Sequence, residues 1–449
     1  MGRNFAHFPF SPQRCPFFYG WVVVFACTVG MLASIPGQTM GVGVFAEDLL
    51  ANLSLSRVDL TSAYMYGTCV SGVLLPFAGL LYDRLGARLV VVLASSSLAA
   101  SVFYLSQCDH LAHQLSLKLG YEASDAAVQM LVLSLGFFLI RFWGQGVLTT
   151  ISRTTMGKWF HRRRGLAAGI SGLAVTAGFS SSPRFLASLI EQFGWREAWM
   201  ILGAGVGAGM SFIGWLLYRD NPEKCGLRMD GASAEQRDGQ DAGPNPTGHR
   251  EYTLREALGT YPFWVFSGAL ALSALIGTAW TFHIESFGNY AGMTKTEAVN
   301  IFLPTAGCSV VANLFSGWIS DRVRIKYLLW AHLISLGTAS LGMMHLDSST
   351  GRALIVLGLG ISGGIWAILM SVVWPRFYGR RHLGAIASVA MSMTVIASAL
   401  GPVAFALAEE RWGSYDVGCI GSAALCAAGF AAALILRNPQ IEKVPAASS

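Results

Sequence analysis

The sequence predicts an all-α membrane protein whose transmembrane helices form two related halves. Of its 449 residues, 53% are hydrophobic and 12% are charged, whereas a soluble globular chain carries roughly 25% charged residues. Long apolar runs recur along the chain, and a charged motif appears once in each half. Because a helix needs about 20 apolar residues to cross a bilayer core, each run of that length is interpreted as one span.

Twelve apolar runs reach this length, and short polar links separate them. Their expected bounds are residues 18–45, 60–82, 88–107, 128–152, 165–190, 197–218, 262–286, 298–320, 327–346, 353–374, 384–407 and 416–436. Residues 1–16 precede them as a mildly basic segment without the pattern of a cleavable signal peptide. Residues 438–449 follow them as a short tail.

A repeated motif divides the chain. GLLYDRLGAR at residues 79–88 returns 238 positions later as GWISDRVRIK at residues 317–326. A second repeat joins residues that are 219 positions apart: Gly165 with Gly384, Pro183 with Pro402, and Gly194 with Gly413. The sequence therefore predicts two pseudo-symmetric six-helix bundles, residues 17–218 and residues 260–437.

The polar stretch 219–259 joins these halves. Its middle, GASAEQRDGQDAGPNPTGHR, is rich in Gly, Asp and Pro and has too few apolar residues to form a core. Such a composition favours a flexible, largely disordered linker.

The basic residues predict the orientation. With the N-terminus inside, the inner segments hold 23 of the 31 Lys and Arg residues, and the outer segments hold six. Cytoplasmic loops carry the excess of Lys and Arg. We therefore expect a multi-pass protein of the cell's inner membrane with both termini and the linker in the cytoplasm.

Composition and motifs exclude several classes of function. The formal net charge of +6 lies in short links and not on one solvated face, so no nucleic-acid partner is expected. The eight cysteines form no C-x-x-C pair, so neither a disulfide framework nor a metal site is expected. The sequence has no HExxH motif, no G-x-S-x-G nucleophile elbow and no phosphate-binding loop. We expect no enzymatic activity and no cofactor, and we expect gradients to supply the energy.

Several short strings of this sequence resemble the major facilitator superfamily, and the resemblance covers nearly the whole chain. GLLYDRLGAR is similar to its signature between helices 2 and 3, DRVRIK to the degenerate second copy, and RFWGQG at residues 141–146 to its helix 4 signature. GWVVVFACTVG, SRVDLTSAY, KWFHRRRGLAAGI, RRHLGAIAS and ALGP resemble the monocarboxylate and oxalate–formate branch. That branch usually has an Arg in helix 8, where this chain has Asn313, and a Lys in helix 11, which is missing here.

The resemblance implies two bundles that rock around a central cavity, with the repeated charged motifs at residues 79–88 and 317–326, here called the hairpins, acting as gates. The gating candidates are Gly79, Asp83, Arg84, Gly86, Arg88, Asp321 and Arg322. Asp83 is expected to accept hydrogen bonds from a helix N-terminus or to pair with a nearby Arg or a neighbouring helix. In the alternative interpretation, these charges only fix the topology.

Ionisable residues inside a bilayer are candidates for solute contact. Arg141 lies near the middle of helix 4 and is a candidate carboxylate clamp, or alternatively a brace that bonds carbonyls of helix 1. Arg184 in helix 5 is a second candidate, and its alternative is snorkelling to the outer headgroups. His283 in helix 7 is a candidate proton carrier, or a polar residue at a helix end. The neutral candidates are Gln38, Tyr64, Gln145 and Asn313, for which interhelical contacts are the alternative.

The sequence thus favours a secondary transporter for a small organic anion, driven by protons or by exchange. Glu285 is the only carboxylate near a span interior, and Arg141 would repel a cation, so a cationic solute is disfavoured. A carrier of a larger amphiphilic or neutral solute and a non-transporting sensor remain as alternatives. The expected partners are the solute and the lipid bilayer, and a monomer is expected.

Overall fold

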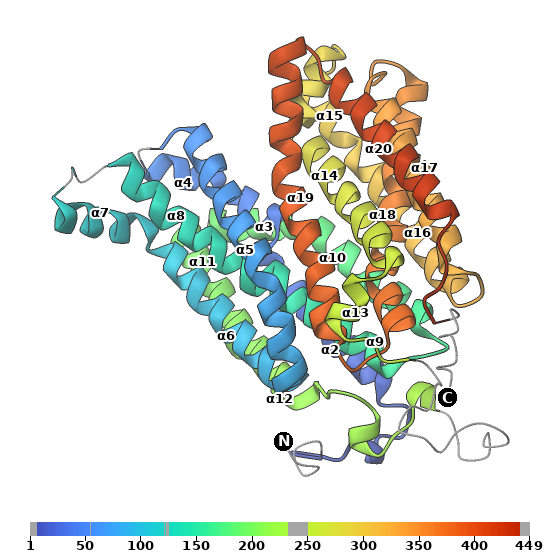
Figure 1. Cartoon of the computed structure of the whole chain (residues 1–449). Helices are drawn as coiled ribbons and strands as arrows, with labels where there is room; N and C mark the ends of the chain where they lie inside the picture. The colour runs from blue at the N-terminus through green and yellow to red at the C-terminus, as the bar shows by residue number, and fades with distance from the viewer. Residues whose placement is uncertain (1–6, 54, 121, 123–124, 232–249, 441–449) are drawn as a thin grey trace.

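The computed structural model describes residues 7–53, 55–120, 122, 125–231 and 250–440. Helices dominate this part of the chain and form two groups (Figure 1). The groups meet at the end that holds Gly86, Asp321 and the segment 219–231, which we call the gate end. They lie apart at the opposite end (Figure 1). The first and last described residues also lie at the gate end.

The N-terminal half is built from segments that follow one another with few intervening residues. They are α2 (Gly20–Ala33), η2 (Ile35–Gly37), α3 (Thr39–Val44), α4 (Ala46–Asn52), α5 (Arg57–Leu85), α6 (Ala87–Ser106), α7 (Cys108–Leu119), α8 (Ala126–Ile140), η3 (Arg141–Leu148), α9 (Thr149–Trp159), α10 (Arg164–Phe193), α11 (Trp195–Ala204), η4 (Gly205–Met210) and α12 (Ser211–Leu217).

The C-terminal half consists mostly of long helices. They are α13 (Leu254–Leu258), α14 (Tyr261–Tyr290), α15 (Lys295–Asn300), α16 (Phe302–Ser320), α17 (Ile325–Met343), α18 (Ser349–Tyr378), α19 (Leu383–Trp412) and α20 (Asp416–Leu434).

The all-α fold with two helical halves is confirmed. Among the described residues, nine helices are long and apolar enough to cross a membrane, and α2 is a shorter apolar helix. Two further helices, α10 and α17, are long but carry more polar residues, because α10 contains Arg184 and several serines and α17 contains His332. Together these segments make the twelve expected spans.

Three expected spans differ from the continuous helices that the apolar runs predicted. The first span is broken between Ala33 and Thr39, where Pro36 removes a backbone donor and Gln38 is extended. Helix 4 passes through the π-helical turn η3 and continues to Trp159, well beyond the expected end at residue 152. Helix 6 also contains a π-helical turn, η4, in a glycine-rich stretch.

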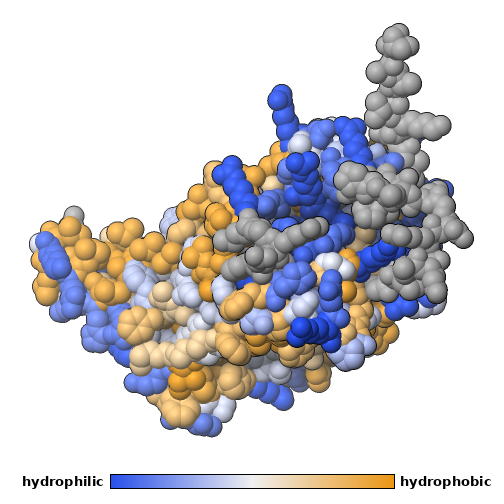
Figure 2. Space-filling model, turned by 90° about the horizontal axis from the view of Figure 1, so that it is seen from below, coloured by the Kyte–Doolittle hydropathy of each residue, from blue (hydrophilic) through white to orange (hydrophobic). Residues whose placement is uncertain are grey.

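The links also contain structure that the sequence did not predict. The link after Ser106 contains the helix α7. The expected linker 219–259 forms short helices at both ends, η5 (Glu223–Cys225), η6 (Met229–Gly231) and α13. Its middle, residues 232–249, lies outside the described residues. Figure 2 views the gate end, where hydrophilic residues gather beside hydrophobic ones.

Helices from opposite halves pack in two pairs, α5 with α19 and α10 with α16. Helix α5 begins at a capping box formed by Ser56 and Asp59 and ends at Gly86, whose φ of 86° suits glycine. These two pairs bring the charged hairpins against the other half and so position the gate.

Candidate transport pathway and gate

Asp83 joins the two halves at the gate end. Its carboxylate accepts hydrogen bonds from the backbone N–H groups of Gly384 at 3.0 Å and Ala385 at 2.9 Å, at the N-terminus of α19. The Lys158 ammonium lies 3.8 Å from the same carboxylate. A negative group is stabilised at a helix N-terminus by the free N–H donors and by the helix dipole. Asp83 therefore holds α19 against α5.

Asp321 makes the equivalent contact in the opposite direction. It accepts hydrogen bonds from the backbone N–H groups of Gly165 at 2.9 Å and Leu166 at 3.1 Å, at the N-terminus of α10. Burial raises the pKa of the Asp321 carboxyl, and the two N–H donors oppose that rise. Each half thus supplies one carboxylate and one helix N-terminus.

Glycines make this close approach of the helices sterically feasible. A Cβ on Gly384 would lie 2.7 Å from both the Asp83 carboxylate and the Gly79 carbonyl oxygen, and a Cβ on Gly317 would lie 2.6 Å from the Gly165 carbonyl oxygen. Real Cβ atoms do not come this close to such atoms. The repeated glycines therefore allow the helices to touch, and the gate end is closed in this structure.

Two basic residues of the hairpins, Arg88 and Arg322, donate to carbonyl groups of their own half. Arg88 donates to the Tyr218 carbonyl at 3.4 Å and lies over the Trp215 ring within the N-terminal half. Arg322 donates to the Trp318 carbonyl at 2.8 Å, and Arg84 is exposed. Of the alternatives expected for Asp83, the helix N-terminus matches the structure, and pairing with Arg84 or Arg88 does not, because the N-terminus of α19 and Lys158 surround the carboxylate.

The ends of the linker contribute two further carboxylates that the sequence did not single out. Asp230 accepts hydrogen bonds from the backbone N–H groups of residues 161–163, the shortest being 2.8 Å from Arg162. Glu251 accepts from the backbone N–H groups of Arg380 at 2.7 Å and Arg381 at 2.8 Å. These two loops are equivalent in the two halves and precede α10 and α19.

The Arg380 side chain spans the halves at the same end. It donates to the Lys158 carbonyl at 2.8 Å and to Glu223 at 2.8 Å. Lys158 ends helix 4, and Glu223 lies in the linker after helix 6. Arg380 therefore adds a third connection across the closed gate.

Arg141 occupies a cluster inside the N-terminal half. Its guanidinium donates to the Gly37 carbonyl at 3.4 Å and the Thr39 hydroxyl at 3.2 Å, and it lies over the Tyr64 ring at 5.1 Å. Tyr64 donates to the same hydroxyl at 2.9 Å. The side chain is 1% exposed. This geometry matches the brace interpretation, since Arg141 holds the break in helix 1 against the π-helical turn.

The neutral candidates lie at helix contacts. Gln38 donates to Ser34 at 2.9 Å and to Thr149 at 3.4 Å. Asn313 donates to the Gly364 carbonyl at 3.4 Å and lies against Gly172 of the other half. The Oδ1 atom of Asn313 and the Oε1 atom of Gln145 are buried without a hydrogen-bond partner among the described residues. Asn313 and Gln145 therefore retain acceptor capacity.

The remaining two candidates are separate from this cluster. His283 uses both ring nitrogens within the C-terminal half, 2.9 Å from the Pro402 carbonyl and 3.2 Å from the Tyr415 hydroxyl. Arg184 is exposed on α10. The structure therefore brings together Arg141 and Tyr64, but it does not join them with His283.

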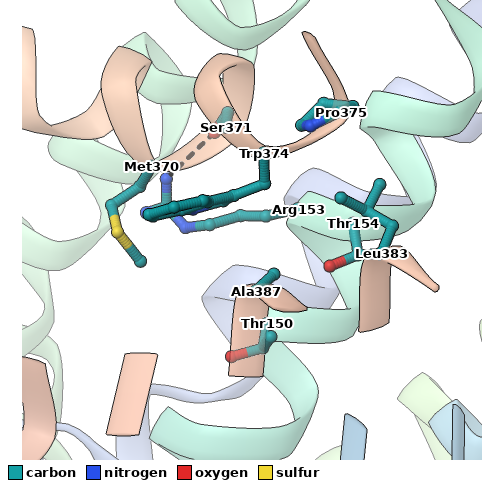
Figure 3. A pocket seen from close by; sticks show the side chains of 9 residues that line it. All are labelled: Thr150, Arg153, Thr154, Met370, Ser371, Trp374, Pro375, Leu383 and Ala387. Atoms are coloured by element: carbon teal, nitrogen blue, oxygen red, sulfur yellow. Dashed lines mark hydrogen bonds between the residues drawn. The ribbon is translucent and has the colours of Figure 1, made fainter. Parts of the chain in front are cut away.

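Arg153 is a further candidate residue that the sequence did not single out. The expected bounds 128–152 leave it just outside the fourth span, but it lies inside helix 4 and faces the other half (Figure 3). Its NH1 group donates to the Ala367 carbonyl and the Ser371 hydroxyl of α18, both at 3.2 Å. Its guanidinium lies 5.5 Å from the centre of the Trp366 ring. The missed signal is the polar string after residue 148, which continues the helical pattern to Trp159.

A small cavity lies beside Arg153, between the halves. It is lined by Thr150, Arg153, Thr154, Met370, Ser371, Trp374, Pro375, Leu383 and Ala387 (Figure 3). No carboxylate is among these lining residues. In the part of the chain described here, no group of three His, Cys, Asp or Glu residues is arranged to hold a metal ion.

Comparison with known proteins agrees with this geometry. The model of the Major Facilitator Superfamily matches residues 22–402. Mouse "Monocarboxylate transporter 11" is 24% identical over 89% of this chain and 83% of its own length, and rat "Monocarboxylate transporter 12" is 22% identical over 92% and 83%. The "Probable sulfoacetate transporter SauU" of Cupriavidus necator is 24% identical over 62% of this chain and 65% of its own length.

Solved structures share the fold. The E. coli fucose:proton symporter FucP superposes with a TM-score of 0.64 over 93% of this chain and 98% of its own, at 14% identity. A structure of FucP in the outward conformation gives a TM-score of 0.59 over 92% and 97%, at 15% identity. Because the family model covers most of the sequence and the architecture agrees, the chain belongs to the Major Facilitator Superfamily and is a membrane transporter.

Proposed function

We propose that this chain is a secondary transporter that carries a small, monocarboxylate-like organic anion by alternating access. The observation that carries the proposal is the pair of arginines inside helix 4. Arg141 and Arg153 donate only to carbonyl and hydroxyl groups, and neither has a carboxylate partner among the described residues. Charge inside a membrane is costly, so uncompensated positive charge beside a transport pathway favours an anionic solute.

The gate contacts support alternating access. In the proposed orientation, the gate end is cytoplasmic, and this structure is the state that is closed toward the cytoplasm. Opening that end requires α19 to leave Asp83 and α10 to leave Asp321. Both contacts are made by side chains of one half with backbone groups of the other, so one rigid rotation of the halves breaks them together.

The family relatives add support for the solute class. Two of them are named as monocarboxylate transporters and one as a probable sulfoacetate transporter. A wide aromatic cavity for a larger amphiphile has less support, because Trp280 and Trp374 are each 1% exposed and pack on Phe287 and Phe263. We further propose that the solute moves together with protons or in exchange for a counter-anion.

Transport in proteoliposomes tests this function. Uptake of radiolabelled acetate, lactate, pyruvate, oxalate and benzoate is compared with uptake of an amine and a sugar. A second series imposes a pH gradient or preloads the vesicles with the unlabelled acid. We expect saturable uptake of at least one acid that the gradient or the counter-anion accelerates. Uptake of the amine or the sugar alone would overturn the proposal.

A further inference from the structure

We propose that the cavity between α9, α18 and α19 is a carboxylate-binding subsite that is used when the gate end opens. Its ligands are the guanidinium of Arg153, the hydroxyl of Thr150 and the indole N–H of Trp374. This inference rests on the proposed anion transport and assigns a specific site to it.

Two unused donors belong to residues that line this cavity. The Oγ1 atom of Thr150 and the Nε1 atom of Trp374 are buried without a hydrogen-bond partner among the described residues, and both residues line the cavity. A buried polar group without a partner costs about 1–3 kcal/mol, so each such group in a native protein calls for an explanation. Two such groups beside one arginine indicate a shared ligand.

The chemistry of the lining selects an anion. A guanidinium and an indole N–H are donors only, and a threonine hydroxyl can donate. No carboxylate lines the cavity. The carboxylate of a solute has two oxygens. Both can accept hydrogen bonds from the guanidinium of Arg153 while a second donor also binds the carboxylate.

The present contacts of Arg153 are made across the interface that must open. Arg153 and Thr150 belong to the N-terminal half, whereas Ala367, Ser371 and Trp374 belong to the C-terminal half. When the gate end opens, the hydrogen bonds from Arg153 to Ala367 and Ser371 break. The guanidinium then lines one wall of the opened passage with free donors, and the anion lies between it and the indole N–H of Trp374 on the facing wall. Arg153 thus braces the closed state and binds the anion in the open state.

The test holds the gate open and measures binding directly. Gly165→Leu serves as a wedge, because a Cβ at Gly165 already collides with the Gly317 carbonyl oxygen. The wedged protein in nanodiscs is titrated calorimetrically with acetate, lactate, pyruvate, oxalate and benzoate, and with the uncharged amides of these acids. We expect at least one acid to bind and its amide to bind more weakly.

Substitutions in the wedged protein then assign the site. Arg153→Gln is expected to weaken acid binding by about tenfold or more, the range of a hydrogen bond to a charged group, and to leave amide binding unchanged. Trp374→Phe and Thr150→Val, which keep the side-chain shape, are each expected to weaken it several-fold. Arg324→Gln, which changes an exposed arginine on a link, is the matched control.

The outcomes separate this inference from the proposed function. If the wedged protein binds an acid and Arg153→Gln, Thr150→Val and Trp374→Phe all retain its full affinity, the subsite is wrong and the proposed function stands. If the wedged protein binds none of the acids, both proposals fail. Thermal unfolding of each variant without ligand shows whether the variant is folded. If Arg153→Gln is not folded, the affinity of Trp374→Phe for the acid decides between the outcomes.

Discussion

Asp83 and Asp321 hold equivalent positions 238 residues apart, and each carboxylate caps a helix of the half to which it does not belong. The helices that they cap, α19 and α10, start at glycines that are 219 residues apart, Gly384 and Gly165. The candidate gate is therefore a reciprocal pair of caps, one from each half. In the proposed alternating-access cycle, its two contacts form and break together.

Asp83→Asn is expected to slow turnover more than it weakens solute binding. An amide keeps an acceptor but loses the charge that the N-terminus of α19 stabilises, which is worth roughly 0.5–2 kcal/mol. Hydrogen exchange of the peptide that contains Gly384 and Ala385 should accelerate several-fold. Asp321→Asn is the matched variant and should accelerate exchange at Gly165 and Leu166. Unchanged exchange in both variants, with unchanged turnover, would reduce the hairpins to topology signals.

Gly384→Leu is expected to prevent closure of the gate end and to reduce uptake by more than tenfold. A Cβ at this position would lie 2.7 Å from the Asp83 carboxylate, so the larger side chain separates α19 from α5. Gly268→Leu is the control, since nothing lies within 4 Å of a Cβ there. The measurement is initial uptake per correctly inserted molecule. Equal uptake by both variants would contradict the role of this close contact.

Arg141→Gln is expected to abolish uptake, to leave membrane insertion intact and to destabilise the ligand-free protein. The variant loses the donors to Gly37 and Thr39 at the break in helix 1, and lost hydrogen bonds to a charged group cost about 1.5–3 kcal/mol. Thermal unfolding in detergent measures this. Arg184→Gln, which changes an exposed side chain, should leave the melting temperature unchanged. A fully stable Arg141→Gln protein would refute the brace, and normal uptake would remove Arg141 from the mechanism.

Arg380→Ala is expected to favour the gate-open state, because it removes donors to both Lys158 and Glu223. Glu223→Gln removes only the ion pair. Since Glu223 is partly exposed, its contribution is expected at about 0–1 kcal/mol and should weaken in salt. Hydrogen exchange of residues 157–160 should rise more in Arg380→Ala than in Glu223→Gln. The reverse order would show that the ion pair, and not the carbonyl contact, is the main connection.

The sequence was a good guide to the architecture and a partial guide to the site. Periodic apolar runs and the two repeats predicted the halves, because spanning a bilayer constrains composition strongly. The resemblance to the family added a helix N-terminus as one of the alternative partners of Asp83, but the identity of the helix depends on tertiary packing. Arg153 was missed because a basic residue just after an apolar run is indistinguishable from a topology signal. Only the structure shows that helix 4 continues past it.

The cluster around Arg141 shows a second limit. Pro36 signals a break in helix 1, but no local pattern indicates that Gly37 then packs on the π-helical turn of helix 4. The carboxylates Asp230 and Glu251 were likewise hidden inside a polar stretch whose composition favours disorder. Their hydrogen bonds are to backbone groups of distant loops, and such partners leave no trace in side-chain patterns.

The two linker carboxylates each serve the half to which they are attached. Asp230 binds the loop before α10, and Glu251 binds the loop before α19. If the polypeptide were cut between residues 231 and 250, each fragment would therefore keep the hydrogen bonds between its own carboxylate and its own loop. Co-expressed fragments should then reassemble into a working carrier through the paired aspartate caps. The two halves would therefore work together without a covalent bond between them.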